Sequence, residues 1–170
     1  MDLQSRLRHI PDFPKPGIDF IDITPLLQDA QALHGAVGQL AEHLRGAEFD
    51  VIVASEARGF IIGAPLAYAL GRGFVPVRKA GKLPYKTIST SYSLEYGQDV
   101  LQMHEDAIRP GQRVVIADDL LATGGTALSC VRLVEQLGGK VVKLAFLVEL
   151  EELRGREDLA GYDVVSLIRL

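Results

Sequence analysis

Two adjacent carboxylates and a turn of small residues form the part of the sequence best suited to chemistry. Asp118 and Asp119 follow the apolar residues 114–117. The turn begins shortly afterwards and consists of Ala122, Thr123, Gly124, Gly125 and Thr126. It offers backbone N–H groups and hydroxyls without bulky side chains, at the start of an expected helix, and this arrangement suits a phosphate monoester. Carboxylates for sugar hydroxyls or Mg²⁺ beside such a turn indicate a phosphorylated sugar as ligand.

Other interpretations of this segment are an ordinary connection and a different phosphate-binding motif. Two acids and a Gly-Gly pair also fit an ordinary connection between a strand and a helix. Other phosphate-binding motifs are absent from the sequence: it has no G-x-x-x-x-G-K-[ST], and no G-x-G-x-x-G follows a strand. The whole string 114–126, an apolar strand, two acids and a Thr-Gly-Gly-Thr turn, resembles the 5-phosphoribosyl-1-pyrophosphate binding motif of type I phosphoribosyltransferases. This resemblance favours the sugar-phosphate site.

Apolar runs alternate with amphipathic stretches, and this alternation predicts the scaffold of the site. The expected strands are 51–54, 74–77, 114–117, 141–148 and 164–167, with a hairpin at 91–96 and 99–104. The expected helices run from the Asp29 cap to Gly46, from about 60 to 70, and from 126 to 137. Pro76 places its strand at an edge or near an end. We expect an α/β fold with an open, mainly parallel twisted sheet flanked by helices, and one domain over residues 1–170.

Composition limits the function classes. The chain has 170 residues, 48% of them hydrophobic, with a net charge of −4. That charge argues against a general nucleic-acid or membrane-surface binder, which needs a basic face. No apolar run is long enough to span a membrane and no signal peptide is recognisable, so a cytoplasmic location is expected. The single Cys130 is expected to be a packing thiol, and the four histidines lack metal-ligand spacing.

Cations follow two of the expected strands. Arg58 comes after the strand at 51–54, and Arg78, Lys79 and Lys82 lie in a basic segment after the strand at 74–77. Surface ion pairs or a solvated charge run would explain each in isolation. Their place at strand ends, near the expected phosphate site, favours capture of a pyrophosphate.

Five segments together resemble adenine phosphoribosyltransferase, a member of the type I phosphoribosyltransferases. They are F-P-K-P-G-I at 13–18, E-A-R-G-F at 56–60, V-R-K-A-G-K-L-P at 77–84, Y-S-L-E-Y-G at 92–97 and the strand and turn at 114–126. They occur in the order of that family and extend from about residue 10 to residue 150. The resemblance implies purine salvage: AMP and pyrophosphate form from adenine and 5-phosphoribosyl-1-pyrophosphate (PRPP).

The resemblance also implies a role for each matching position. The 5′-phosphate would bind to residues 122–126, and the ribose hydroxyls would bind to Asp118 and Asp119. Mg²⁺ would be bound through PRPP, pyrophosphate and water, with no direct protein ligand, and Glu95 would be the general acid/base. Pyrophosphate would contact Arg58, Arg78, Lys79 and Lys82. Adenine would contact Asp19, Phe20, Arg58 and Leu150.

The family further implies a homodimer, a small hood from about 1–30 plus the C-terminal segment, and a flexible loop at about 79–100. Ile21 departs from the family pattern, which often has Arg after the stacking Phe, and Asp19 stands where an apolar residue is usual. Two alternatives stay open at this point. The same fold could use another purine base, or the protein could be a PRPP-sensing regulator, although no DNA-binding segment is recognisable.

Overall fold

The computed structural model describes residues 2–94 and 97–170. The strands are β1 Arg8–Pro11, β2 Asp19–Asp22, β3 Val51–Ser55, β4 Gly73–Lys79, β5 Thr87–Leu94, β6 Gly97–His104, β7 Arg113–Leu121, β8 Lys140–Glu149 and β9 Val164–Arg169. The helices are α1 Thr24–Gln28, α2 Ala30–Leu44, α3 Arg58–Leu70, α4 Gly125–Gln136 and α5 Gly155–Asp158, with short 3₁₀ turns η1 Gln4–Arg6 and η2 Glu151–Leu153. The structure confirms the expected α/β fold.

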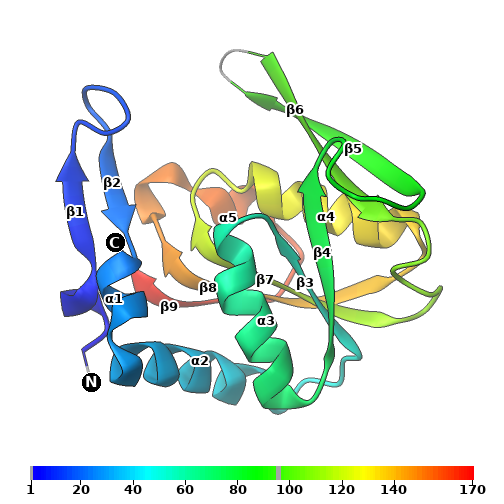
Figure 1. Cartoon of the computed structure of the whole chain (residues 1–170), viewed down its shortest axis with the longest axis horizontal. Helices are drawn as coiled ribbons and strands as arrows, with labels where there is room; N and C mark the ends of the chain where they lie inside the picture. Colours follow the sequence, from blue (N-terminus) through cyan, green and yellow to red (C-terminus); the bar gives the residue numbers. More distant parts are fainter. Residues whose placement is uncertain (1, 95–96) are drawn as a thin grey trace.

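A seven-stranded sheet with the order β5-β6-β4-β3-β7-β8-β9 forms the centre of the molecule (Figure 1). Strands β4, β3, β7, β8 and β9 are parallel, and the hairpin β5–β6 adds two antiparallel strands beside β4. The sheet is therefore mainly parallel, as the sequence predicts. The hairpin was also expected, although β5 begins at Thr87 rather than Ser91.

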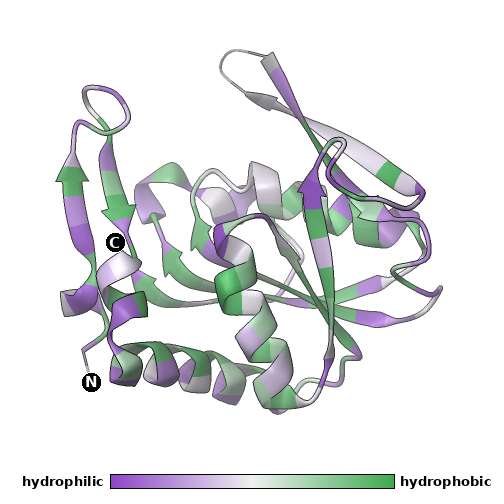
Figure 2. Cartoon of the chain, viewed as in Figure 1, coloured by the Kyte–Doolittle hydropathy of each residue, from purple (hydrophilic) through white to green (hydrophobic). Residues whose placement is uncertain are grey.

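Helices cover both faces of this sheet, and alternate residues of each central strand point to opposite cores. In β7, Val115 and Ala117 pack in the core under α2 and α3, whereas Val114 and Ile116 pack in the core under α4. The central strands are accordingly hydrophobic over most of their length in Figure 2. This pattern is typical of parallel strands buried on both faces. Cys130 lies buried in the second core, where a packing role was expected.

The strand order changes direction between β3 and β7. The chain leaves β3 and returns as β4 on one side of it, and β7 later pairs with its other side. Ligands of open α/β sheets bind at such a switch point, outside the carboxyl ends of the strands. Residues 55–59 begin with the last residue of β3, and residues 118–126 include the end of β7 and the turn after it, so both expected motifs meet there.

Two strands differ from expectation in instructive ways. The strand at 114–117 continues as β7 to Leu121, because β8 keeps pairing with it up to Glu149 after β3 has ended at Ser55. Asp118 and Asp119 therefore belong to the strand itself. Pro76 lies in β4, an interior strand rather than an edge strand, but β6 pairs only with Arg78 and Lys79 of β4. Its missing N–H therefore costs no hydrogen bond to β6.

A two-stranded antiparallel sheet, β1–β2, stands apart from the main sheet beside the C-terminus (Figure 1). The three prolines within residues 11–16 would by themselves predict a rigid extended loop here. The prolines are compatible with the hairpin because β1 ends at Pro11 and the other two lie in the connection. Among the described residues, no helix has the length and apolar character needed to cross a membrane.

Candidate active site

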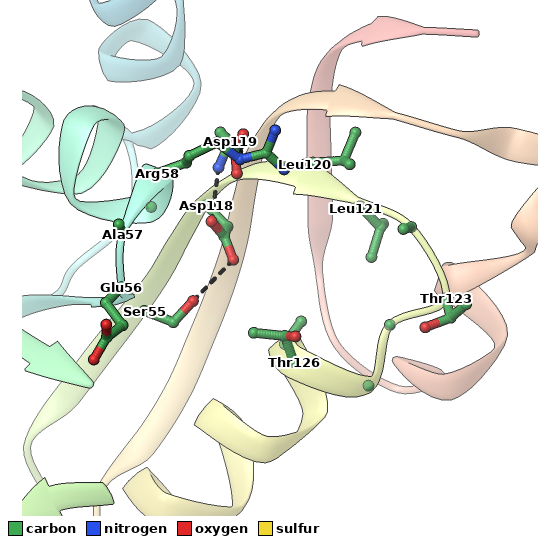
Figure 3. A pocket seen from close by; sticks show the side chains of 15 residues that line it. Ser55, Glu56, Ala57, Arg58, Asp118, Asp119, Leu120, Leu121, Thr123 and Thr126 are labelled. Atoms are coloured by element: carbon green, nitrogen blue, oxygen red, sulfur yellow. Dashed lines mark hydrogen bonds and ion pairs between the residues drawn. The ribbon is translucent and has the colours of Figure 1, made fainter. Parts of the chain in front are cut away.

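A cavity of about 280 Å³ lies at the switch point of the sheet and is lined by residues 55–59 and 118–127 (Figure 3). The whole expected phosphate turn, both carboxylates and Arg58 line this one cavity. Two segments that are more than fifty residues apart in sequence thus form a single site. The juxtaposition follows from the adjacent pairing of β3 and β7.

The phosphate turn leads directly into α4. Gly124 has a φ of +93°, in the left-handed region where a side chain is strained, and α4 begins at Gly125. The first N–H groups of a helix have no partner within the helix and point out of its N-terminus. The turn therefore presents backbone donors to the cavity, together with the hydroxyl groups of Thr123 and Thr126 (Figure 3).

Asp118 is held in place by a residue of β3. The Ser55 hydroxyl donates a hydrogen bond to Oδ2 of Asp118 at 3.1 Å (Figure 3). A methyl group added at Gly59 would lie 2.7 Å from Oδ1 of Asp118. Only glycine therefore leaves room for this carboxylate at its position. Burial, and secondly the neighbouring charge of Asp119, raise the pKa of Asp118 well above its ordinary range.

Asp119 is 3% exposed and lies against Arg58, whose Nε is 3.0 Å from its Oδ2. Burial raises the pKa of Asp119, and the charge of Arg58 acts in the opposite direction. Within the described residues, this buried Oδ2 accepts no hydrogen bond of good geometry. A buried carboxylate oxygen of this kind needs a donor. The hydroxyls of a bound ribose, or a cation carried by its phosphates, fit this requirement.

Arg58 also covers the ring of Phe20. Its Cζ lies 5.3 Å from the Phe20 ring centroid, and the Phe13 ring packs edge-on against Phe20 with centroids 5.2 Å apart. The resemblance assigns adenine to a face of Phe20, so a base stacked on the face that Arg58 covers would have to displace the guanidinium. Asp19 and Leu150 line a second cavity, of about 430 Å³, between the β1–β2 hairpin and the C-terminal segment. Of the four residues expected to bind adenine, Arg58 thus lines the first cavity, Asp19 and Leu150 line the second, and Phe20 contacts Arg58.

Ile21 is 5% exposed and packs in the core. Side chains alternate along a strand, so Ile21 points away from the face that carries Phe20. An arginine at this position would need to leave the core before it could reach the cavity. The departure from the family pattern is therefore accommodated by packing.

The remaining expected cations lie beside the cavity and not in its wall. Arg78 donates from Nε to Oε1 of Glu56 at 3.2 Å, and Nζ of Lys79 lies 3.6 Å from Oδ2 of Asp99. Lys82 is exposed on the turn after β4, whose carboxyl end is strongly hydrophilic in Figure 2. Glu95, the expected general acid/base, lies outside the described residues.

Tyr92 of the hairpin β5–β6 lies close to the phosphate turn. The ring of Tyr92 is within 3.6 Å of the position that a Cβ of Gly125 would take. Its hydroxyl donates to Oδ2 of Asp99 at 3.1 Å, and this carboxylate is also the partner of Lys79. The basic segment and the phosphate turn are therefore connected through one carboxylate.

Three residues of this site were not identified from the sequence. Ser55 positions Asp118, Gly59 leaves room for it, and Glu56 holds Arg78 and accepts the backbone N–H of Lys79 at 2.8 Å. All three lie in the segment 55–59, in which the sequence assigns a functional role only to Arg58. Their contacts are with strands β4 and β7, so strand pairing would have been needed to find them.

A family model described as phosphoribosyl transferase domain matches residues 26–168. The match covers most of the chain, and the chain therefore belongs to the phosphoribosyltransferase family. Within that family it belongs to the adenine phosphoribosyltransferases. The adenine phosphoribosyltransferase of Acetivibrio thermocellus is 61% identical over 170 residues, which are 99% of each chain. That of Caldicellulosiruptor saccharolyticus is 60% identical over 169 residues, covering 99% of this chain and 97% of the relative.

Solved structures agree with this assignment. The adenine phosphoribosyltransferase of Thermoanaerobacter pseudethanolicus has a TM-score of 0.97 at 58% identity and covers 99% of this chain and 98% of its own. The enzyme of Saccharomyces cerevisiae, complexed with D-2,5-dideoxy-2,5-imino-altritol 1,6-bisphosphate and adenine, has a TM-score of 0.91 at 39% identity. It covers 97% of this chain and 96% of its own. The resemblance read from the five sequence segments is thereby confirmed.

Proposed function

We propose that the protein transfers the 5-phosphoribosyl group of PRPP to adenine and releases AMP and pyrophosphate. The observation that carries the proposal is the single cavity that joins the turn 122–126, the paired carboxylates and Arg58 at the switch point of the sheet. This set matches the three parts of PRPP: a phosphate monoester, a ribose with two free hydroxyls, and an anionic leaving group.

The chemistry follows from the charges that develop. The bond from ribose C1 to pyrophosphate breaks as the bond from C1 to adenine N9 forms, so positive charge grows on the sugar and negative charge on pyrophosphate. Asp118 and Asp119 orient the ribose through its hydroxyls, and Arg58 meets the negative charge. Mg²⁺ would be held through PRPP, pyrophosphate and water, with no direct protein ligand, and would supply further positive charge to the leaving group. Glu95 is proposed to accept the N9 proton.

The test is product formation from PRPP and Mg²⁺ with adenine, guanine, hypoxanthine, xanthine, uracil and orotate in parallel reactions. We expect AMP from adenine and, with the other bases, rates lower by at least about 100-fold. Preference for another purine would overturn the base assignment while keeping the PRPP site. Binding of PRPP without turnover of any base would favour a regulator instead.

We also propose that the protein is a homodimer that uses the outer face of α3. Residues 59–70 of this helix carry no charged side chain, although Ile61 is 39% and Tyr68 90% exposed. Ile61, Ala64 and Tyr68 recur at helical spacing on the exposed face. An exposed apolar face on an otherwise buried helix is typical of a subunit interface.

Replacing Tyr68 with glutamate is expected to weaken the dimer by at least about 30-fold in Kd, because a charge would be buried without a partner. Light scattering across a concentration series measures the change. Leu153→Glu, which places the same charge at another exposed apolar residue, serves as the control and is expected to leave the association unchanged. A monomeric wild type, or equal effects of the two substitutions, would refute the proposed interface.

A further inference from the structure

The short helix α5, which follows β8 and η2, packs directly against the phosphate turn. About thirty residues separate α5 from the turn in sequence. Gly155, the first residue of α5, is buried. A methyl group added there would collide with the carbonyl oxygen of Ala122 and lie 3.1 Å from the backbone nitrogen of Gly124. The backbone of Gly155 thus occupies the space immediately behind the turn.

Gly124 of the turn is equally close to the backbone of Gly155. A methyl group added at Gly124 would lie 2.6 Å from the carbonyl oxygen of Gly155 and 3.2 Å from Cβ of Asp158. Two glycines therefore let two backbones approach with no side chain between them. If either segment moves, the other has to move with it, because there is no free space between the two backbones.

An ion pair holds Gly155 in this position. Arg156 donates from Nε and Nη2 to the two carboxylate oxygens of Glu149 at 2.6 and 2.8 Å, and from Nη1 to the carbonyl of Val164 at 2.9 Å. The Glu149 side chain is 5% exposed. Its burial alone would raise its pKa, but the hydrogen bonds from Arg156 and Ser166 and the nearby arginine charges outweigh burial and lower the pKa. The forked geometry is specific to arginine.

The loop closed by this ion pair also contains Leu150. The backbone N–H of Leu150 donates to the carbonyl of Leu121 at 2.9 Å, immediately before the phosphate turn. The ion pair Glu149–Arg156 therefore closes a strap, residues 149–156, that is tied to the turn at both of its ends.

We propose that Gly155 and the Glu149–Arg156 ion pair are positioning residues for the 5′-phosphate of PRPP, an inference that rests on the proposed function. None of these three residues lines the cavity at the switch point. They fix the turn 122–126 from behind, so that its backbone donors keep the spacing that a phosphate requires. The effect is expected on binding of the sugar phosphate, and not on binding of the base.

Gly155→Ala tests this inference against Gly38→Ala, a control at a helical glycine that has no atom within 4 Å of an added methyl group. Calorimetric titration with ribose 5-phosphate measures the phosphate site without any need for turnover. We expect Gly155→Ala to raise the Kd for ribose 5-phosphate and the KM for PRPP at least about tenfold, while the KM for adenine stays within about twofold. Gly38→Ala is expected to change none of these.

Unchanged Kd and KM values in Gly155→Ala would overturn the inference, as would an equal rise in the KM for adenine. If Gly155→Ala does not fold, Arg156→Lys and Arg156→Gln replace it. Lysine keeps the charge without the fork, so its effect on the Kd for ribose 5-phosphate is expected to lie between those of wild type and glutamine. Both variants binding like wild type would equally overturn the inference. If the wild type binds ribose 5-phosphate but converts no base, the proposed function fails while this inference still stands or falls on the Kd values.

Discussion

Replacing Asp118 with asparagine is expected to lower kcat/KM for PRPP by about 10- to 100-fold, since hydrogen bonds to a charged group contribute about 1.5–3 kcal/mol. The same substitution is expected to make the ligand-free protein more stable. Asp118 is half-buried next to Asp119 in the wall of the cavity, where its charged form is unfavourable. Asparagine can keep its Oδ1 as the acceptor of the Asp119 backbone N–H, while its Nδ2 donates to the Ser55 hydroxyl, which then accepts instead of donating.

The pH dependence of the stability gain follows from the direction of the shift. The pKa of Asp118 in the folded protein is raised above its ordinary value of 3.8, so the folded state loses stability as the carboxyl ionises with rising pH. We therefore expect Asp118→Asn to gain about 1–3 kcal/mol at about pH 8 and almost nothing at about pH 3, where the unfolded carboxyl is also largely protonated. Thermal unfolding at the two pH values measures this difference.

Asp50→Asn is the matched control. Asp50 accepts the backbone N–H of Arg113 at 2.8 Å, and this hydrogen bond, with the Arg113 charge, lowers its pKa. Its substitution is expected to reduce stability at about pH 8 and to leave kcat/KM within about twofold. The assignment of Asp118 would be wrong if its asparagine variant retained full activity, or lost stability as Asp50→Asn does.

Gly59→Ala is expected to lower kcat/KM at least about tenfold without unfolding the protein. Alanine normally favours a helix by about 1 kcal/mol over glycine. Here the added methyl group would lie 2.7 Å from Oδ1 of Asp118, so the carboxylate has to move out of its place. Steady-state kinetics with PRPP as the varied substrate measure the loss.

Gly63→Ala, one turn later in α3, is the control that separates this loss of activity from a general loss of stability. Its methyl group would lie 2.7 Å from Cβ of Ala54 in the core, so we expect reduced stability with normal activity per folded molecule. The Gly59→Ala loss should also vanish in an Asp118→Ala background, where the clash is gone. A loss that persists in that background would show that Gly59 acts through something other than Asp118.

The sequence was sufficient for the scaffold and for the part of the site that is contiguous in the chain. Strands 51–54 and 141–148 were identified because parallel strands buried on both faces are continuous apolar runs, and the Asp29 cap fixed the start of α2. The turn 122–126 carries its glycines and threonines in one short stretch. Local patterns of this kind can be read without knowledge of which strands pair.

The rest of the site depends on contacts between distant segments. Gly155 supports Gly124 only because β7 and β8 are neighbours, and Ser55 reaches Asp118 only because β3 and β7 are. The β1–β2 hairpin was missed because three prolines in its region argue against regular structure when tertiary pairing is unknown. The stacking of Arg58 on Phe20 joins this hairpin to α3, and no local pattern indicates it.

A crystal structure with AMP bound tests the central claim most directly, because it locates phosphate, ribose and base at once. We predict that the phosphate oxygens lie about 3 Å from the backbone nitrogens of residues 122–126, with the ribose hydroxyls on Asp118 and Asp119. The adenine ring should lie against Phe20, with Arg58 displaced from it. AMP with its phosphate outside this turn, or bound wholly in the second cavity beside Asp19 and Leu150, would contradict the account.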